Sequence, residues 1–291
     1  MGSIIGDFEG VPLLCRDAAV VNFGHTDAWR NVPRANALGI AASHGELSMV
    51  SEELLTTFFR KLELRDNVSA EERAVLLACA GDEVYFPAGS DLVREGDRPT
   101  ESMLVVSGFS TRYRDQVDGT RHITAIHIAG DFVDLHSLLL KEMDHSVGAL
   151  SDCHVLKFPH RGLVALTESY PHLTRLLWLM TLIDGAIHRE WLASSGRPAV
   201  EHLARLICEL YVRLKAAGTI SGDTFILPVT QNELGEALGL SAVHVNRTLQ
   251  QLRSENLFTW QGQEIHILDW PGLQKRALFD ARYLHLVPEP R

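Results

Sequence analysis

Three side chains able to hydrogen-bond to nucleotides stand close together near the C-terminus: His244, Asn246 and Arg247. A guanidinium can bind O6 and N7 of guanine with two hydrogen bonds, so Arg247 is the best candidate for a base contact. Asn246 and His244 could contact a base or a phosphate. Ser241 precedes them, and a helix starting there would bind backbone phosphate through its N-terminus. The chemistry that these residues favour is recognition of duplex DNA.

The residues around this group predict two short helices joined by a tight turn. Thr230 is a good N-cap, and Glu233 three residues later completes a capping box. Gly239 supplies the turn, where a positive φ is needed, and Ser241 caps the second helix. Each helix carries apolar residues on its inner face: Leu234 and Leu238 on the first, then Val245, Leu249 and Leu252 on the second.

This pattern is that of a helix-turn-helix, whose second helix enters the major groove and presents its first turns to base edges. Two β-rich runs follow, 258–260 and 265–268, and predict a hairpin wing. A plain helical hairpin is the alternative. The agreement of both caps, the turn glycine and the exposed arginine favours a winged helix-turn-helix. Its exposed face would carry these residues: Ala242, Val243, His244, Asn246 and Arg247.

Charge gives no support for DNA binding. The net charge is −10, which argues mildly against a nonspecific nucleic-acid coat. Residues 229–276 hold four Lys/Arg and five Asp/Glu, so the local balance is not basic either. A DNA reader is not excluded, because the relevant quantity is the field at the contact face.

Length and composition are those of a globular protein with about two domains among its 291 residues. No apolar run approaches the roughly 20 residues of a membrane span. The N-terminus is not a secretory signal, since Asp7 and Glu9 stand where basic residues would be. No CxxC pair exists, so we expect reduced thiols and a cytoplasmic location rather than disulfides or a zinc ribbon. The cysteines lie far apart: Cys15, Cys79, Cys153 and Cys208.

The regions before the helix-turn-helix differ in their periodicity. Residues 1–50 show none that is sustained, and we expect a loosely ordered extension. Apolar residues then recur at helical spacing from Leu54 to Leu62, and Ser69 with Glu72 predicts a second capped helix. Over residues 82–160, turn signals alternate with short β-rich runs, which predicts a compact antiparallel roll or barrel.

A long helix is predicted from about Pro171 to Ala193. Its apolar residues step by 3, 4, 3 and 4, which is a heptad-like seam. The seam has two interpretations, a dimer interface or a face that packs on the chain's own roll. The apolar stripe is wide enough for both. The seam consists of Leu173, Leu176, Met180, Ile183 and Ile187.

The order of roll, long helix and winged helix-turn-helix resembles the Crp/Fnr family of bacterial transcription regulators, over residues 52–285. The similarity is most specific in three short segments: Leu234-Gly235, Gly239-Leu240-Ser241 and Val245-Asn246-Arg247. The turns Pro87-Ala88-Gly89 and Gly130-Asp131-Phe132 also fit. The resemblance implies homodimers on palindromic sites, a signal received in the roll, and RNA polymerase as a partner.

With this resemblance, the sequence predicts an α+β fold that divides into four parts. Residues 1–50 form the extension, and 51–170 a jelly-roll-like β-roll with flanking helices, similar to cyclic-nucleotide-binding domains. Residues 171–195 form the dimerisation helix and hinge, and 196–285 the winged helix-turn-helix domain. In the last part, the family's base-reading arginine matches Arg247. Ala242 and Val243 fall on two further base-reading positions, where an apolar contact to a thymine methyl is possible.

The resemblance places an effector pocket in the roll. The family's cyclic-nucleotide binders use a Gly-Glu pair for the ribose and an arginine before Ser/Thr-Ala for the phosphate. Here the first pair is Gly130-Asp131 and the second segment is His145-Ser146-Val147, with no arginine near it. A neutral histidine replaces that arginine poorly, which argues against cyclic-AMP control. The candidate pocket residues are Gly130, Asp131, Phe132, Asp134, His145 and Ser146.

The other sensors of the family find little support. An iron–sulfur cluster needs several N-terminal cysteines, and only Cys15 lies there. Asp131, Asp134, His136 and His145 concentrate acids and imidazoles, but their spacing is not specific for a metal, so no metal site is predicted. Haem is not expected either, although axial ligands are present: His122, His127, His136, His145 and Cys153.

Two other classes of function are alternatives to a DNA-binding regulator. The first is a ligand-binding module whose C-terminal helices bind a protein instead of DNA, which the acidic balance favours. The second is an enzyme, which the sequence does not support, because it contains no G-x-S-x-G, no P-loop and no H-E-x-x-H. The sequence predicts a non-enzymatic DNA-binding regulator.

Overall fold

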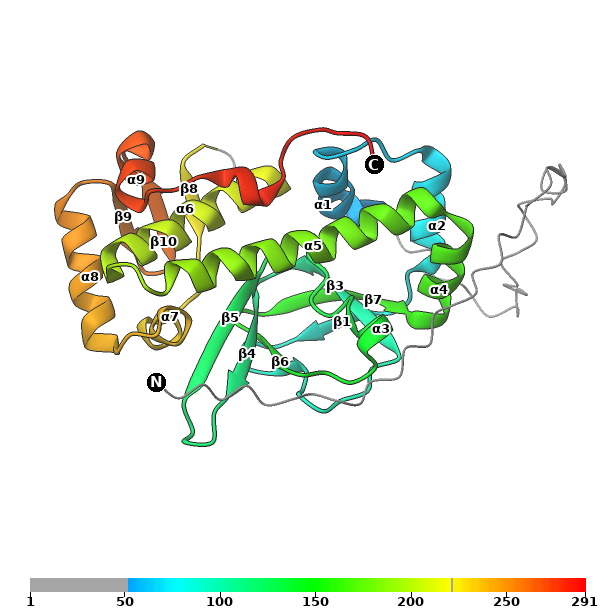
Figure 1. Ribbon diagram of the computed structural model, residues 1–291, viewed down its shortest axis with the longest axis horizontal. Coiled ribbons are helices and arrows are strands. Elements are labelled where there is room, and N and C mark those ends of the chain that lie inside the picture. Colours follow the sequence, from blue (N-terminus) through cyan, green and yellow to red (C-terminus); the bar gives the residue numbers. More distant parts are fainter. Residues whose placement is uncertain (1–51, 221) are drawn as a thin grey trace, which may run out of the picture. The chain divides into compact units, whose positions relative to one another are not determined.

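The computed structural model describes residues 52–220 and 222–291. In this part of the chain, a group of antiparallel strands is followed by a long helix and then by a helical domain with its own small sheet (Figure 1). The predicted α+β class and order of elements are confirmed. The extension predicted for residues 1–50 lies outside the described residues.

The β-roll consists of two antiparallel sheets. The strands run in the order β1–β7–β3 in one sheet and β2–β6–β4–β5 in the other. Val93, Val105, Val147 and Val155 are buried between them in a common apolar cluster, because successive side chains of a strand point to opposite faces. The strands are β1 (Glu83–Phe86), β2 (Asp91–Val93), β3 (Glu101–Ser107), β4 (Ser110–Asp115), β5 (Arg121–His127), β6 (Ser146–Ala149) and β7 (Cys153–Pro159).

Four helices accompany the roll. The predicted capping box of the second is present, since Ser69 Oγ accepts from Glu72 N and the Glu72 carboxylate accepts from Ser69 N. Phe58, Phe59 and Leu62 of the first helix pack with Phe158 of β7 in one buried cluster. The helices are α1 (Glu52–Glu63), α2 (Ala70–Cys79), α3 (Ser137–Leu140) and α4 (His160–Ser169).

The long helix α5 spans Pro171–Ser194, close to the predicted limits. Leu173, Leu176, Ile183 and Ile187 of the predicted seam are buried in the chain's own core, and only Met180 is partly exposed. The assignment of those four residues to a dimer interface is therefore corrected, because the roll and the C-terminal domain already cover that face. The large apolar side chains that α5 exposes lie elsewhere on the helix: Trp178, Leu182 and Leu192.

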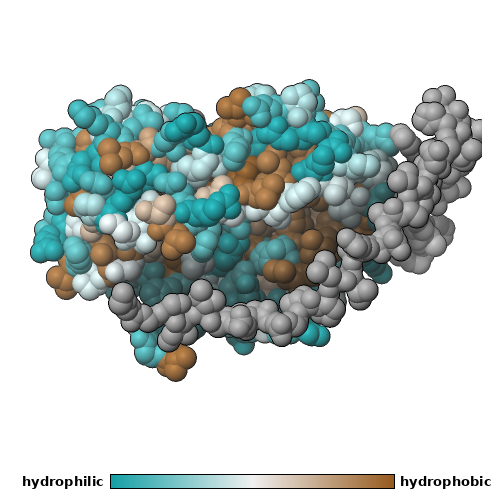
Figure 2. Space-filling view, viewed as in Figure 1, coloured by the Kyte–Doolittle hydropathy of each residue, from teal (hydrophilic) through white to brown (hydrophobic). Residues whose placement is uncertain are grey.

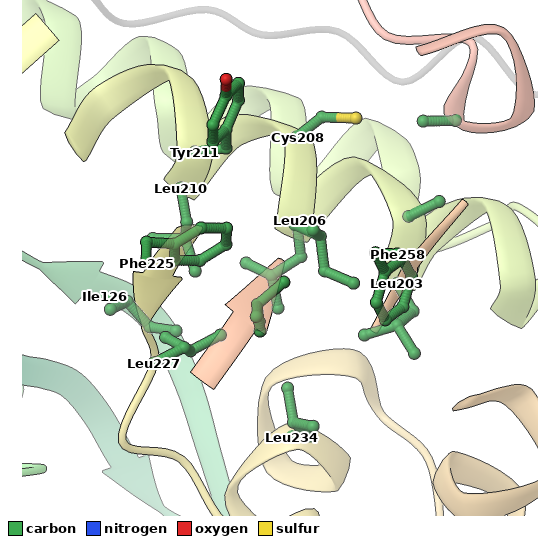
Figure 3. Close-up of a cluster of buried hydrophobic side chains, with 14 of the residues drawn as sticks. Ile126, Leu203, Leu206, Cys208, Leu210, Tyr211, Phe225, Leu227, Leu234 and Phe258 are labelled. Carbon is green, nitrogen blue, oxygen red and sulfur yellow. The ribbon is translucent and has the colours of Figure 1, made fainter. Parts of the chain in front are cut away.

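The C-terminal domain has one core built around α6. Leu203, Leu206 and Leu210 of α6 point toward strand and helix residues such as Phe225 and Leu234 (Figure 3). Ile126 of β5 belongs to the same cluster, so the roll and this domain share buried apolar contacts. The elements are α6 (Ala199–Ala217), β8 (Thr224–Ile226), α7 (Gln231–Leu238), α8 (Ala242–Ser254), β9 (Phe258–Gln261), β10 (Glu264–Ile267), α9 (Trp270–Ala277) and the 3-10 helix η2 (Ala281–Leu284).

The segment after α9 returns to the first helix of the roll (Figure 1). Arg65 Nη2 donates to the carbonyl of Leu284 at 2.9 Å, and Glu289 N donates to the carbonyl of Arg65 at 2.8 Å. Arg65 is almost fully buried, so these bonds are shielded from water. Across residues 52–220 and 222–291, no helix combines the length and apolar character required to span a bilayer.

Candidate nucleic-acid interface and effector cavity

The helix-turn-helix is built by the capping residues that the sequence predicts. Thr230 Oγ1 accepts from Glu233 N, and the Glu233 carboxylate accepts from Thr230 N, so both orphan donors are satisfied. Gly239 ends α7 with a φ of +67°. Ser241 then caps α8 by accepting from His244 N. The start and direction of α8 are therefore fixed by local hydrogen bonds.

Gly235 allows α7 and the turn to approach each other closely. The carbonyl of Gly235 accepts from Leu240 N at 2.9 Å. A Cβ on Gly235 would lie 2.4 Å from the carbonyl oxygen of Leu240. That distance is well inside van der Waals contact, so only glycine fits there without a backbone shift. The sequence carried this signal in the Leu234-Gly235 pair.

The outer face of α8 exposes Val243 and Arg247, while Ala242, His244 and Asn246 are partly exposed. Val245, Thr248, Leu249 and Leu252 hold the opposite face in the core.

Within the described part of the chain, no hydrogen bond or ion pair joins the guanidinium of Arg247 to another residue. Asn246 is oriented by two amide contacts, with Gln231 at 3.4 Å and with Gln250 at 2.9 Å. The predicted DNA-contacting side chains therefore share one face of α8, with Arg247 free to bind a ligand.

The β4–β5 hairpin of the roll reaches this region, which the sequence did not indicate. A wide, open groove is lined on one side by Asp115, Arg121 and His122 of the hairpin and on the other by Glu236 and Ala242. Burial raises the pKa of Glu236, while the nearby Arg121 opposes that rise. The roll thus contacts the helix-turn-helix beside the first residue of α8.

A second cavity, of about 400 Å³, lies between the second sheet of the roll and α5. Of the predicted pocket residues, Asp131, Phe132 and His145 line it. Gly130, Asp134 and Ser146 are not among the lining residues and have structural roles instead.

The structural roles of those three residues are visible in their contacts. Gly130 has a φ of +79°, and a Cβ there would lie 2.8 Å from Lys61 Cδ. The Asp134 carboxylate is fully buried and accepts from Met103 N at 2.6 Å, and burial raises its pKa to about 7. Ser146 Oγ accepts from Glu95 N at 3.0 Å. Their assignment to the pocket is corrected, because each one holds the backbone of the roll.

Asp131 is the centre of a buried charge network. One carboxylate oxygen lies 2.5 Å from Lys61 Nζ and the other 2.9 Å from Arg213 Nη2. Arg213 also pairs with Glu209 at 3.0 Å, within α6. Burial alone would raise the pKa of Asp131, but the adjacent Lys61 and Arg213 hold it well below its usual range. Burial lowers the pKa of Lys61 to about 8, which Asp131 partly offsets.

The sequence missed the arginines of the cavity. Arg112 and Arg114 of β4 line it, although no arginine stands near His145 in the chain. Arg112 Nη2 lies 2.8 Å from the carboxylate of Asp184 on α5. Alternation along β4 places both side chains on one face, and β4 lies beside β6. The spacing of the two arginines along β4 was therefore visible in the sequence, but only the pairing of β4 with β6 shows that they reach the cavity.

These residues do not fit the cyclic-nucleotide pattern. Both oxygens of Asp131 are bound by cations of the chain itself, so the carboxylate is not free for a ribose hydroxyl. Arg112 is paired with Asp184, and the buried Arg213 is paired with Asp131 and Glu209, so neither is free for a phosphate. The sequence-based argument against cyclic AMP therefore gains support from the geometry.

The cysteines of the described residues do not fit an iron–sulfur cluster. Cys79, Cys153 and Cys208 are buried in α2, β7 and α6, and burial raises the pKa of each thiol. Cys79 and Cys153 donate to the carbonyls of Gly162 and Phe109. A cluster requires thiolates that converge on one centre. The fourth cysteine, Cys15, lies outside the described residues.

Two segments of the chain match known families. Residues 83–170 match the cyclic nucleotide-binding domain, and residues 201–276 match the Crp-like helix-turn-helix domain. The transcriptional activator protein anr of Pseudomonas aeruginosa is 30% identical over 184 residues, which are 62% of this chain and 74% of that protein. The transcriptional activator protein FnrL of Cereibacter sphaeroides is 26% identical over 220 residues, 70% of this chain and 88% of that protein.

Solved structures agree on the fold. FixK2 from Bradyrhizobium japonicum superposes with a TM-score of 0.61 at 24% identity, over 67% of this chain and 96% of that one. The c-di-GMP-responsive global regulator CLP of Xanthomonas campestris gives a TM-score of 0.55 at 16% identity, over 68% of this chain and 99% of that one. At these identities the likeness extends to the arrangement of elements.

Proposed function

The chain belongs to the Crp/Fnr family of transcription regulators and is a DNA-binding regulator; from its geometry we infer that it binds a palindromic promoter site as a homodimer, controlled by a ligand in the roll. The observation that carries this proposal is the outer face of α8. There Arg247 is exposed and bound to no other described residue, on a helix whose start is fixed by Ser241.

The proposed DNA contacts divide into two kinds. Arg247 reads a guanine, and Ala242 and Val243 contact a thymine methyl. Thr230, Ser241 and the N-terminus of α8 bind backbone phosphates, which set the position of the helix but carry no sequence information. Asn246 and His244 contact a base or a phosphate at the edge of this face.

Selection of binding sites from random duplex DNA tests the proposal. We expect the purified full chain to recover a palindrome and Arg247→Ala to lose about 10- to 100-fold in affinity for each half-site, because a bidentate arginine–guanine pair contributes about 1–3 kcal/mol. Arg282→Ala is the matched control, because Arg282 is highly exposed and lies on η2. Equal affinity of both variants for the recovered site would exclude Arg247 as the reader.

The same assay separates DNA binding from the alternative, a C-terminal domain that binds a protein. Selection is repeated with Zn²⁺ and with cyclic nucleotides, so that a regulator that requires a ligand is also detected. No enriched sequence under any of these conditions would favour the protein-binding module.

The dimer interface is proposed on the exposed face of α5. Trp178, Leu182, Gly185 and Leu192 follow at steps of 4, 3 and 7, which is a heptad-like pattern two positions away from the seam predicted by sequence. Trp178, Leu182 and Leu192 are 64%, 51% and 69% exposed. On the side of the molecule where α5 lies in front, patches of apolar surface interrupt the hydrophilic surface (Figure 2).

Leu182→Glu tests this interface, because a buried charge at the centre of the stripe opposes association. We expect monomers by light scattering and weakened binding to the palindrome. Leu139→Glu is the control, since Leu139 is 80% exposed on α3. A Leu182→Glu protein that remains dimeric would place the interface elsewhere.

The domain division at about residues 170 and 195 is kept as part of the proposal. It is supported by the long α5, which ends at Ser194, and by the start of α6 at Ala199. RNA polymerase is the proposed protein partner, because relatives of this chain are named transcriptional activators.

A further inference from the structure

Two histidines and an aspartate converge at one wall of the cavity in the roll. His136 stands immediately before α3, and Asp144 and His145 precede β6. Donor atoms of all three side chains lie within 4.8 Å of one another. All three line the cavity, where His145 is buried and Asp144 is exposed to solvent.

The two imidazoles have nitrogen atoms without a partner. His145 is 7% exposed, and its Nε2 and the Nε2 of His136 are buried atoms with no hydrogen-bond partner in the described part of the chain. Buried polar atoms normally have a hydrogen-bond partner, so two nitrogen atoms without one at the same cavity wall require an explanation. The rings lie close together, with centroids 4.9 Å apart.

Asp144 orients one of these rings. Its Oδ1 lies 2.5 Å from Nδ1 of His145, which therefore carries the proton and leaves the lone pair on Nε2. A carboxylate that holds a histidine in this way is a common neighbour of protein metal ions, because it fixes the tautomer and raises the basicity of the ligand.

The donor set specifies a class of ion. Imidazole nitrogens suit zinc, copper, iron and nickel, and two histidine ligands leave coordination positions open for water or another ligand. A histidine binds a metal ion only as the neutral imidazole. Burial lowers the pKa of both rings, to about 4 for His136, and the charge of Arg112 lowers both further.

We propose that this cavity binds a divalent first-row transition-metal ion through His136 and His145, with Asp144 as the carboxylate that orients His145. The sequence predicted no metal site, and it grouped Asp134 with these histidines. The fold instead uses Asp134 to hold Met103 N and brings Asp144 into the cluster.

The charge of the cavity permits a cation. Arg112, Arg114 and Arg213 line it, but so do three aspartates, and Arg112 is paired with one of them, since it lies 2.8 Å from Asp184. Arg213 is likewise held between Asp131 and Glu209. The His136–Asp144–His145 group therefore does not face an uncompensated positive wall.

The metal would join two segments that face α5. His136 is held next to α3 and His145 next to β6, while Met180, Asp184 and Gly185 of α5 form the opposite wall. This inference names the ligand class of the cavity and rests on the proposed function only in treating that ligand as the signal.

Metal binding by the full chain is the test, and no DNA is present, so its failure would leave the DNA-binding proposal intact. Protein stripped with a chelator is titrated with Zn²⁺ against a chromophoric competitor, and with Fe²⁺ without oxygen. We expect one site per chain. His136→Gln and Asp144→Asn should weaken it by about 10- to 100-fold or more, the range found when even a supporting group of a metal site is removed.

Asp144→Asn secures the test against misfolding, because the Asp144 side chain is 75% exposed. His285→Gln is the control, since His285 is an exposed histidine in the C-terminal segment and should bind as the unaltered chain does. Bound Co²⁺ adds a second readout, because its visible spectrum should change in both site variants. No metal uptake, or equal uptake by the unaltered chain and both site variants, would overturn the proposal.

Discussion

The helix-turn-helix and the cavity of the roll are assembled over very different distances in the chain. The residues that position α8, from Thr230 to Arg247, are consecutive turns of one segment, and their hydrogen bonds join residues three apart. The cavity draws on β4, β5, the α3 region, α5 and α6, and the ion pair of Arg112 with Asp184 spans 72 residues. Local chemistry is visible in sequence spacing, whereas the cavity depends on strand pairing and helix packing.

Removal of Arg213 should have the largest effect on the free energy of unfolding, because it breaks buried ion pairs that join distant parts of the chain. Arg213→Met leaves Glu209 and Asp131 with one cation fewer in a buried site. We expect the free energy of unfolding to fall by about 3–5 kcal/mol in chemical denaturation, the range for one broken partner of a buried ion pair. Arg282→Met, at an exposed position, should change it by less than about 0.5 kcal/mol. Similar values for the two variants would contradict the role of the network.

Gly235→Ala tests the local side of the comparison. A Cβ placed 2.4 Å from the Leu240 carbonyl must displace the turn, and we expect a loss of about 1–3 kcal/mol together with weaker DNA binding. Gly162→Ala in α4 is the matched control. Its added Cβ would meet ordinary contacts at 3.7 Å, and alanine should stabilise the helix by up to about 1 kcal/mol. The two substitutions should therefore differ in sign in a thermal unfolding experiment.

Two capping boxes allow a finer comparison. Thr230→Ala and Ser69→Ala each remove one side-chain acceptor at a helix start, and each should cost about 1 kcal/mol of stability. DNA affinity, measured on the selected palindrome, should fall for Thr230→Ala and stay unchanged for Ser69→Ala. If both variants bind DNA equally, the start of α7 does not set the pose of α8.

The smallest expected effect is a pH dependence. His172 on α5 contacts Glu72 at 2.6 Å and Asp66 at 3.2 Å. Burial lowers the pKa of His172, but its bonds to these carboxylates outweigh burial and raise it above the unfolded value. The contribution to stability is therefore complete below the unfolded pKa and disappears as the pH rises through the folded pKa.

Denaturation at pH 6 and pH 8 checks this expectation. The unaltered chain should lose up to about 1 kcal/mol more than His172→Gln on going from pH 6 to pH 8, since the group is partly exposed. An equal pH response of the two proteins would show that His172 does not gain a proton on folding.

The sequence was sufficient to predict those features that depend on residues close together in the chain. Both capping boxes, the left-handed Gly239 and the inward faces of α7 and α8 were predicted from spacing and are present. Periodicity also located α5, but it could not decide which of two apolar faces turns inward. Leu176 and Ile183 are buried, while Trp178 and Leu182 are exposed, because the wide stripe of this helix contacts the roll on one side only.

The cavity could be predicted only in part. Gly130, Asp131, His145 and Ser146 were placed in the pocket through the resemblance, and of these only Asp131 and His145 line the cavity. Arg112 and Asp184 were missed, since sheet pairing and the packing of α5 bring them to the cavity. Asp144 was missed although it directly precedes His145. A search along each strand for charged residues on one face would have found Arg112 and Arg114 together.

The return of the C-terminal segment to α1 has a mechanical consequence. The C-terminal domain is tied to the roll by the chain between α5 and α6, and a second time by the bonds of Arg65 to Leu284 and Glu289. The buried ion pair of Arg213 with Asp131 and the apolar contacts of Ile126 join the same two parts of the molecule. While these attachments hold, they couple the C-terminal domain to the roll, so α8 cannot swing freely.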